Sequence, residues 1–308
     1  MPNLSPLIER VLPAVVSIKA YSTTKSVETP GLPEELKHLF QANDDTGVPG
    51  KIPSSGSGFF VTKVGHVVTS YHLVVNKQNF DVTTSEGKRY KAKLLGLDPI
   101  ADLALLKISG EKFYYLEFSS EERPPLGTWL LSLGSPFGFD FSADLGIVSG
   151  HNRVLPARDR RYFVPHWQSN LSMNPGNSGG PLLDMDGRVL GITTQIYTNN
   201  TQSIGLSFAV PAPVAQFVVA QLLEGPKVLR GRYDFELADT SSTPAAAKVA
   251  SPGKSPLLEG DIIVEFNGYK IHSAAELRYR LGLTMQGQQI AVVVHRKGRS
   301  RNLMLQMR

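Results

Sequence analysis

The sequence predicts a mainly β protein in which two β-barrels are followed by a small α+β domain. From residue 13 to about residue 210, short β-branched runs alternate with turn residues and lack intervening helical periods, which indicates antiparallel β-structure. A polar, proline-containing break at residues 119–127 divides this region into halves of similar size, as two barrels would require. Beyond residue 225 the pattern changes to strands around one amphipathic helix.

The first region is expected to contain ten strands, each a β-branched or apolar run bounded by turn residues. They are residues 14–21, 58–62, 66–70, 80–84, 90–97, 103–108, 128–133, 146–150, 188–196 and 204–210. A helix is expected at 211–224, because proline stands at its start and Gly-Pro directly after it. Residues 21–56 read as one long irregular loop, and loops of that length are commonly functional or disordered.

The C-terminal region predicts a separate α+β domain. Its expected strands are 233–238, 261–268, 290–296 and 301–307. Its expected helix is 272–283. Ser273 precedes Glu276 by three positions, as in a capping box. The basic cluster at 295–301 fits the polar tip of a hairpin between two apolar strands. We therefore predict two domains, 1–224 and 225–308.

Composition excludes several function classes. With 308 residues, 41% hydrophobic and 19% charged, the chain has the composition of a soluble globular protein. It has no cysteine, which excludes disulfides, cysteine-ligated metals and a thiol nucleophile. Its net charge of +5 comes from scattered residues without a nucleic-acid-binding motif, so no nucleic-acid partner is expected. Phosphate-loop, zinc and dinucleotide motifs are missing, so we expect no cofactor.

The N-terminus and the apolar runs give no targeting or membrane signal. No apolar run approaches the roughly 20 residues of a membrane span, so none is expected. The first residues lack the basic start, apolar core and cleavage site of a signal peptide.

Residues 172–181, SMNPGNSGGP, surround Ser178 with glycine and proline. Such a stretch is either a tight turn or a backbone bent to present the hydroxyl. A serine nucleophile needs a general base, usually a histidine held by a buried carboxylate. Of the seven histidines, His72 stands just after the predicted strand 66–70, and Asp102 is the acid within an otherwise apolar run. A cleft between two barrels would collect all three side chains.

Four segments resemble those of the HtrA (DegP/DegQ) serine proteases. They are the histidine segment at 56–75, the aspartate segment at 98–108, the PFG and GIVS segment at 133–150, and the nucleophile segment at 174–194. The resemblance runs in register from about residue 8 to 222. It implies a chymotrypsin-like double β-barrel in which Ser178 is the nucleophile, His72 the general base and then acid, and Asp102 the group that orients it.

The resemblance also implies the remaining parts of the site. Backbone N–H groups of residues 176–178 would form the oxyanion hole, with Gly176 and Ser178 as donors and Asn177 between them. Ser172, six residues before the nucleophile, would lie at the base of the primary pocket, with Ile196 on its wall. A neutral pocket of this kind favours small or medium apolar side chains at the cleaved position.

The implied activity is ATP-independent cleavage of misfolded or unfolded proteins by a trimer, or a multiple of a trimer, in the periplasm or cell envelope. A non-hydrolytic chaperone or scaffold, with its active site held inactive, is the alternative. Two residues depart from the family, Tyr71 before the histidine and Ala101 before the aspartate, and they would alter contacts around the triad. Arg153 resembles the arginine through which the family couples its C-terminal domain to the active site.

Residues 255–281 resemble the second half of a PDZ domain, a module that binds peptide C-termini as an added strand. Its ligand loop would be Arg232, Tyr233, Asp234 and Phe235. Asp234 stands where the family has glycine, and the stretch that follows is shortened. A carboxylate at this position would repel a peptide C-terminus. Peptide binding and a purely packing or scaffolding role therefore both stay open.

Overall fold

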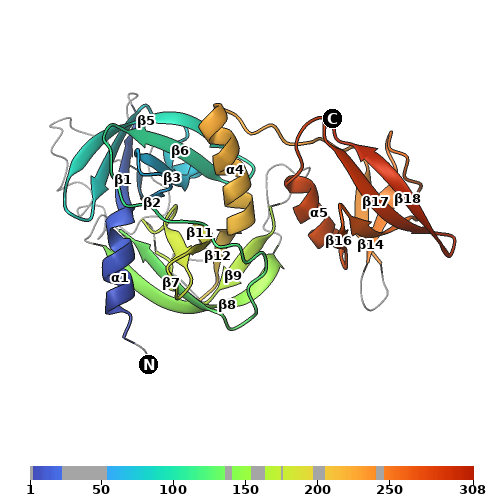
Figure 1. Cartoon of the computed structure of the whole chain (residues 1–308), viewed down its shortest axis with the longest axis horizontal. Helices are drawn as coiled ribbons and strands as arrows, with labels where there is room; N and C mark the ends of the chain where they lie inside the picture. Colours follow the sequence, from blue (N-terminus) through green and yellow to red (C-terminus); the bar gives the residue numbers. More distant parts are fainter. Residues whose placement is uncertain are drawn as a thin grey trace. The chain divides into compact units, whose positions relative to one another are not determined.

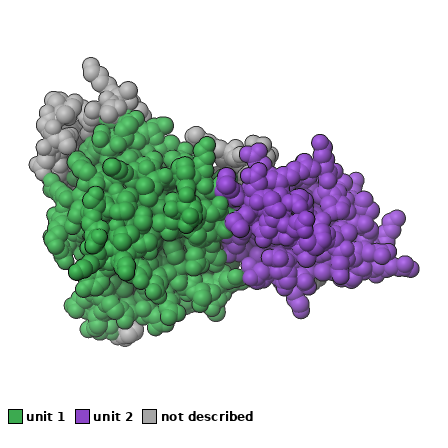
Figure 2. Space-filling view, turned by 45° about the horizontal axis from the view of Figure 1, so that its top comes forward, with its two compact units in different colours: residues 1–151, 166–228 green, residues 152–165, 229–308 purple. Residues whose placement is uncertain are grey.

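The computed structural model describes residues 3–22, 54–135, 141–153, 164–174, 176–196, 205–240 and 246–308. Most of the long loop predicted at 21–56 lies outside these described residues. The chain divides into two compact units, coloured separately in Figure 2. Unit 1 is residues 1–151 with 166–228, and unit 2 is residues 229–308 with 152–165.

The strands of unit 1 form two closed six-stranded barrels (Figure 1). The first has the order β1-β2-β3-β6-β5-β4, with antiparallel neighbours, and the second has the order β10-β11-β12-β9-β8-β7. The first barrel consists of β1 (Val15–Tyr21), β2 (Ser54–Phe60), β3 (His66–Ser70), β4 (Asn79–Thr84), β5 (Arg89–Asp98) and β6 (Leu103–Ile108). The second consists of β7 (Trp129–Gly134), β8 (Ser142–Arg153), β9 (His166–Ser169), β10 (Pro181–Leu183), β11 (Val189–Ile196) and β12 (Ser207–Pro211).

Apolar side chains that alternate along these strands fill each barrel. Ile18, Phe60 and Leu106 are fully buried in the first, and Leu130 and Val148 are buried in the second. Each large apolar side chain removed from water in this way contributes about 1.5 to 3 kcal/mol. The double barrel predicted from the sequence is confirmed.

Four helices accompany the barrels in the described part of unit 1. They are α1 (Ser5–Val11), the short 3-10 helix η1 (Leu12–Ala14), α3 (Tyr71–Val74) and α4 (Ala212–Glu224). The apolar face of α4 buries Val214, Val218 and Leu222. This helix contacts β5 and β6 of the first barrel and β11 and β12 of the second, so it joins the two. It ends before Gly225, as the Gly-Pro signal predicted.

Unit 2 is a six-stranded antiparallel sheet with one helix, the α+β fold expected of a PDZ-like domain. Its elements are β13 (Glu236–Asp239), β14 (Ala247–Ser251), β15 (Ile262–Phe266), β16 (Tyr269–Lys270), α5 (Ala274–Gly282), β17 (Gln289–Arg296) and β18 (Arg299–Gln306). The strand order is β13-β14-β15-β17-β18, with β16 paired to β15. The predicted hairpin tip is confirmed, since Lys297 and Gly298 take positive φ between β17 and β18.

One of the two hydrogen bonds of the predicted capping box is present at the start of α5, and the other goes to the residue before the N-cap Ser273. The Ser273 hydroxyl accepts the N–H of Glu276 at 3.1 Å, and the Glu276 carboxylate accepts the N–H of His272 at 2.9 Å. Leu277 and Leu281 then pack into the core of unit 2.

Candidate active site

His72 lies in the first turn of α3, directly after β3 ends at Ser70. The sequence analysis placed His72 just after a strand, and the structure has a single helical turn at that point. Asp102 lies in the turn between β5 and β6, with a positive φ of 54°. Its backbone carbonyl accepts the N–H of Tyr71 at 3.0 Å. The turn therefore sets the aspartate directly beside the helix that carries the histidine.

Two hydrogen bonds join His72 to the Asp102 carboxylate. The ring Nδ1 lies 2.7 Å from Oδ2, and the backbone N–H of His72 donates to Oδ1 at 2.9 Å. An ionised carboxylate only accepts, so the neutral ring carries its proton on Nδ1 and leaves Nε2 as an acceptor. That tautomer is the one in which the ring can take a proton from a nucleophile. The aspartate side chain is 16% exposed and the histidine side chain 45%.

Thr194, on β11, supplies a further donor to the same carboxylate, since its hydroxyl donates to Asp102 Oδ2. The sequence analysis missed this residue. The only signal for it was the pair of threonines in an otherwise apolar strand, and β-branched residues are common in strands for other reasons. Ala101 before the aspartate carries no polar group, so Thr194 provides a hydroxyl at this carboxylate from the second barrel.

These contacts determine the pKa of Asp102. Burial raises it, but the hydrogen bond from the His72 ring, the electrostatic interaction with His72, the Thr194 hydroxyl and the His72 backbone N–H together outweigh burial. The pKa of Asp102 is therefore lowered below its usual value. The carboxylate stays ionised and can stabilise a protonated imidazole.

Ser178 is held by hydrogen bonds to both barrels. Its hydroxyl donates to the Thr194 carbonyl at 3.0 Å, and its own carbonyl accepts the N–H of Ser57 at 2.9 Å. Among the described contacts, the hydroxyl makes no hydrogen bond to His72. Catalytic hydrogen bonds are often long or misaligned without substrate. Thr194 thus contacts Ser178 through its carbonyl and Asp102 through its hydroxyl.

The glycine after Ser178 explains part of the unusual composition of this loop. Gly179 has a φ of +85°, and a Cβ there would lie 2.3 Å from the Ser57 carbonyl oxygen and 2.5 Å from the Thr69 hydroxyl. Its N–H donates to the Thr193 carbonyl at 2.8 Å. Only glycine fits this position, because β2, β3 and β11 all approach it closely.

The backbone N–H groups expected to form an oxyanion hole differ in availability. Those of Gly176 and Ser178 donate to no acceptor in the described part of the chain. The N–H of Asn177 donates to the Asn174 carbonyl at 3.0 Å, so in this state Asn177 cannot donate to an oxyanion. Gly176 has a φ of +106°, a conformation that glycine adopts without strain.

The remaining predicted residues of the protease site lie in three places. Ser172 is exposed on the segment after β9, and its backbone N–H donates to the Asp144 carboxylate at 2.5 Å. Ile196 ends β11, but its side chain lies outside the described residues. Arg153 is the last residue of β8, with an exposed side chain.

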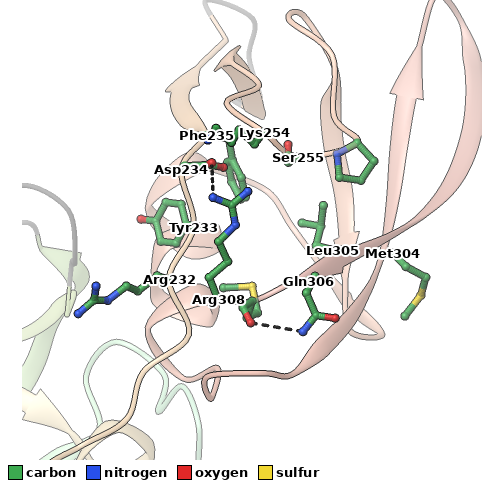
Figure 3. A pocket seen from close by; sticks show the side chains of 12 residues that line it. Arg232, Tyr233, Asp234, Phe235, Lys254, Ser255, Met304, Leu305, Gln306 and Arg308 are labelled. Carbon is green, nitrogen blue, oxygen red and sulfur yellow. Dashed lines mark hydrogen bonds and ion pairs between the residues drawn. The ribbon is translucent and has the colours of Figure 1, made fainter.

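In unit 2, the predicted ligand loop lies just before β13 and lines a pocket with the end of β18 (Figure 3). Phe235 is buried in the core, whereas Arg232 and Asp234 are exposed. The Asp234 carboxylate forms an ion pair with Arg308 at 3.2 Å, and both side chains are more than a third exposed. Figure 3 shows the Arg308 side chain extending towards Asp234.

The strand after this loop, β13, is hydrogen-bonded to the helix α5. In the described sheet β13 pairs with β14 along one edge only. The Leu237 carbonyl accepts a hydrogen bond from Arg278 of α5 at 2.7 Å, and the Asp239 carboxylate accepts the N–H of Ala274 at 2.7 Å. Two contacts thus connect β13 and α5.

The described residues hold no group of three or more histidine, aspartate or glutamate side chains placed to bind a metal ion. Across the same residues, no helix combines the length and apolar character needed to cross a membrane.

Comparison with known proteins agrees with this geometry. Residues 56–192 match the family described as "Trypsin-like peptidase domain". DegP-like periplasmic serine endoproteases of Marinomonas sp. (strain MWYL1) and Hahella chejuensis (strain KCTC 2396) are 37% and 35% identical. The first alignment covers 98% of this chain and 70% of the relative, and the second covers 97% and 68%.

Solved structures give the same result. The HtrA-type protease AlgW with a tripeptide matches with a TM-score of 0.76 and 25% identity, over 99% of this chain and 96% of that one. The predicted periplasmic or envelope localisation agrees with the names of the relatives. The chain therefore belongs to the HtrA family of DegP-like serine endoproteases, and it is a serine protease.

Proposed function

We propose that this protease degrades misfolded or unfolded proteins without ATP, with Ser178 as nucleophile, His72 as general base and Asp102 as the group that orients it. The observation that carries the proposal is the pair of hydrogen bonds from the Asp102 carboxylate to the ring and backbone of His72. They leave Nε2 of the ring as the acceptor for a serine proton.

The reaction starts with rotation of the Ser178 hydroxyl from the Thr194 carbonyl towards His72. The oxygen attacks the substrate carbonyl carbon while Nε2 takes the proton. The N–H groups of Gly176 and Ser178 stabilise the resulting oxyanion, each by about 2.7 to 4 kcal/mol. The protonated histidine then donates to the leaving amine, and water hydrolyses the acyl-enzyme by the same steps.

Substrate choice follows from the primary pocket. With neutral Ser172 at its base and Ile196 on its wall, the pocket accepts small or medium apolar side chains. Apolar pockets separate such side chains by about 10- to 200-fold per methylene, so cleavage is broad. Unfolded chains expose these side chains and are therefore the substrates.

The chain acts as a trimer or a multiple of a trimer, with residues 1–224 as protease domain and 225–308 as PDZ-like domain. Arg153 is the coupling residue between them. The pairing of Asp234 with Arg308 supports weak capture of peptide C-termini at the loop of Arg232, Tyr233, Asp234 and Phe235. The described contacts between β13 and α5 support the same conclusion.

A non-hydrolytic chaperone or scaffold is the second candidate. The observation that favours it is the Ser178 hydroxyl, which donates to the Thr194 carbonyl rather than to the histidine. A state of this kind would bind unfolded chains without cleaving them.

Casein degradation without nucleotide separates the two functions. The protease account expects the parent chain to fragment casein and Ser178→Ala to leave it intact. The mass of the oligomer is measured with and without casein. A parent chain that binds casein as a folded trimer, suppresses its aggregation and cleaves none of it would establish the chaperone instead.

A further inference from the structure

The segment that carries Ser172 has an acidic neighbour that the sequence analysis did not consider. The backbone N–H of Ser172 donates to Oδ2 of Asp144 at 2.5 Å. In the proposed function Ser172 lies at the base of the primary pocket. The inference below therefore rests on that function, since it concerns the charge at the base of the same pocket.

Asp144 reaches this position from β8. Residues at alternate positions along a strand share one face, and Gly146 and Val148, on the same face as Asp144, are buried in the second barrel. Asp144 precedes these two residues along β8 and is half-buried. Its carboxylate is therefore directed to the rim of the barrel, where the segment after β9 passes.

Close packing fixes β8 against that segment. The Ile147 N–H donates to the side-chain oxygen of Asn170 at 2.8 Å. A Cβ on Gly146 would lie only 2.5 Å from the same oxygen and 2.9 Å from the Leu171 side chain, so strand and segment touch without a gap. With the Asp144 bond, two hydrogen bonds and this contact set the carboxylate next to Ser172.

The carboxylate has capacity for one more partner. Within the described part of the chain, Oδ1 of Asp144 has no hydrogen-bond donor, and no lysine, arginine or histidine forms an ion pair with this residue. A positive charge close to a half-buried carboxylate is attracted more strongly than in bulk water. Ser172 itself is exposed, so a side chain entering from solvent can approach the pair.

We propose that Asp144 is a specificity-determining residue that makes the base of the primary pocket acidic, so that the protease also cleaves after basic side chains. An acidic group at the base of this pocket selects basic side chains in chymotrypsin-like proteases. A lysine has an apolar stem long enough to carry its ammonium group into such a pocket, where it would meet Oδ1 of Asp144. The charge at the base of the pocket is then set by Asp144 and not by the neutral Ser172.

The test uses two peptides that are identical except for lysine or valine at the cleaved position, and it measures kcat/KM for each. The variants are the parent, Asp144→Asn and Asp186→Asn. The asparagine oxygen at 144 can still accept the Ser172 N–H, so this change removes the charge and keeps the hydrogen bond. Asp186→Asn is the matched control, because it removes one carboxylate from the exposed turn after β10, elsewhere in unit 1.

We expect the ratio of kcat/KM for the lysyl over the valyl peptide to fall about 10-fold or more in Asp144→Asn, the usual size of a lost hydrogen bond to a charged group. It should not change in Asp186→Asn. Labelling of Ser178 with a fluorophosphonate is measured on all three proteins first. If the parent does not label, the proposed function fails and the inference with it. If it labels and the ratio stays the same in Asp144→Asn, or the lysyl peptide is never cleaved, only the inference is overturned.

Discussion

The Asp102 carboxylate holds His72 at two points, with Oδ2 2.7 Å from the ring Nδ1 and Oδ1 2.9 Å from the backbone N–H. One contact fixes the tautomer of the ring and the other fixes the helical turn that carries it. The positive φ of Asp102 aims the carboxylate at both groups. The relationship thus depends on backbone geometry as much as on the two side chains.

Thr194→Val should slow peptide cleavage about 10-fold, because a hydrogen bond to a charged group is lost while the shape of the side chain is kept. Thr194→Ser is the matched control, since it retains the hydroxyl and should restore most of the rate. The measurement is kcat and KM for one peptide substrate. Equal loss in the two variants would mean that packing, and not the hydroxyl, is what Thr194 provides.

Asp102 should make unit 1 more stable at neutral than at acid pH. Its pKa is lowered in the folded state, so the unfolded chain binds the proton more readily. The resulting stability is complete above the unfolded pKa of about 4 and is lost as the pH falls through the lower folded value.

The check is urea unfolding of the parent and Asp102→Asn at several pH values. Both tryptophans, Trp129 and Trp167, belong to unit 1, so their fluorescence reports on that unit. The parent should have a higher free energy of unfolding than Asp102→Asn. This difference should be constant at neutral pH and should shrink below a pH of about 4. An advantage that grows with acid would contradict the lowered pKa.

Gly179→Ala should abolish fluorophosphonate labelling, because a Cβ there would lie 2.3 Å from the Ser57 carbonyl oxygen. The matched control is Gly87→Ala. Gly87 also has a positive φ, +78°, but has nothing within 4 Å of its Cβ position, so the change should cost only about 1 to 2 kcal/mol of backbone strain. Labelling and tryptophan fluorescence of both variants test this. Labelling of Gly179→Ala at the parent rate would contradict the close approach.

Asp234→Asn should raise the affinity of the chain for a peptide with a free C-terminal carboxylate about 2- to 5-fold, since one exposed repulsion is removed. The effect is small because Arg308 already pairs with this carboxylate. Titration calorimetry on the full chain measures it, with a C-terminally amidated peptide as control. The same gain for the amidated peptide would show that charge at this loop is not the cause.

Long apolar strands and the two barrels could be predicted from the sequence because each strand buries one face and alternates with turns. Four strands were missed. β9, HWQS, is mostly polar, β10 and β16 have only three and two residues, and β14 has small side chains. β9 pairs with β12 and β10 with β7, strands that lie far away in the sequence, and a local pattern does not carry that information.

The contacts around the site show the same limit. The motif around Ser178 and the isolated acid Asp102 were recognisable from residue type and order. Thr194 was not, since its hydroxyl reaches an aspartate that is 92 residues away in the chain. Asp144 was passed over for a similar reason, because its partner Ser172 is 28 residues distant. The packing of the two barrels brings Thr194 to Asp102, and the closure of the second barrel brings Ser172 to Asp144.

The most direct test of the account is covalent labelling of the purified chain with a fluorophosphonate, followed by mass mapping of the modified peptide. We expect one label per chain on Ser178, slow labelling in Asp102→Asn, and none in Ser178→Ala. A folded parent chain that takes up no label, or takes it on another serine, would contradict the assignment of Ser178, His72 and Asp102 as the catalytic triad.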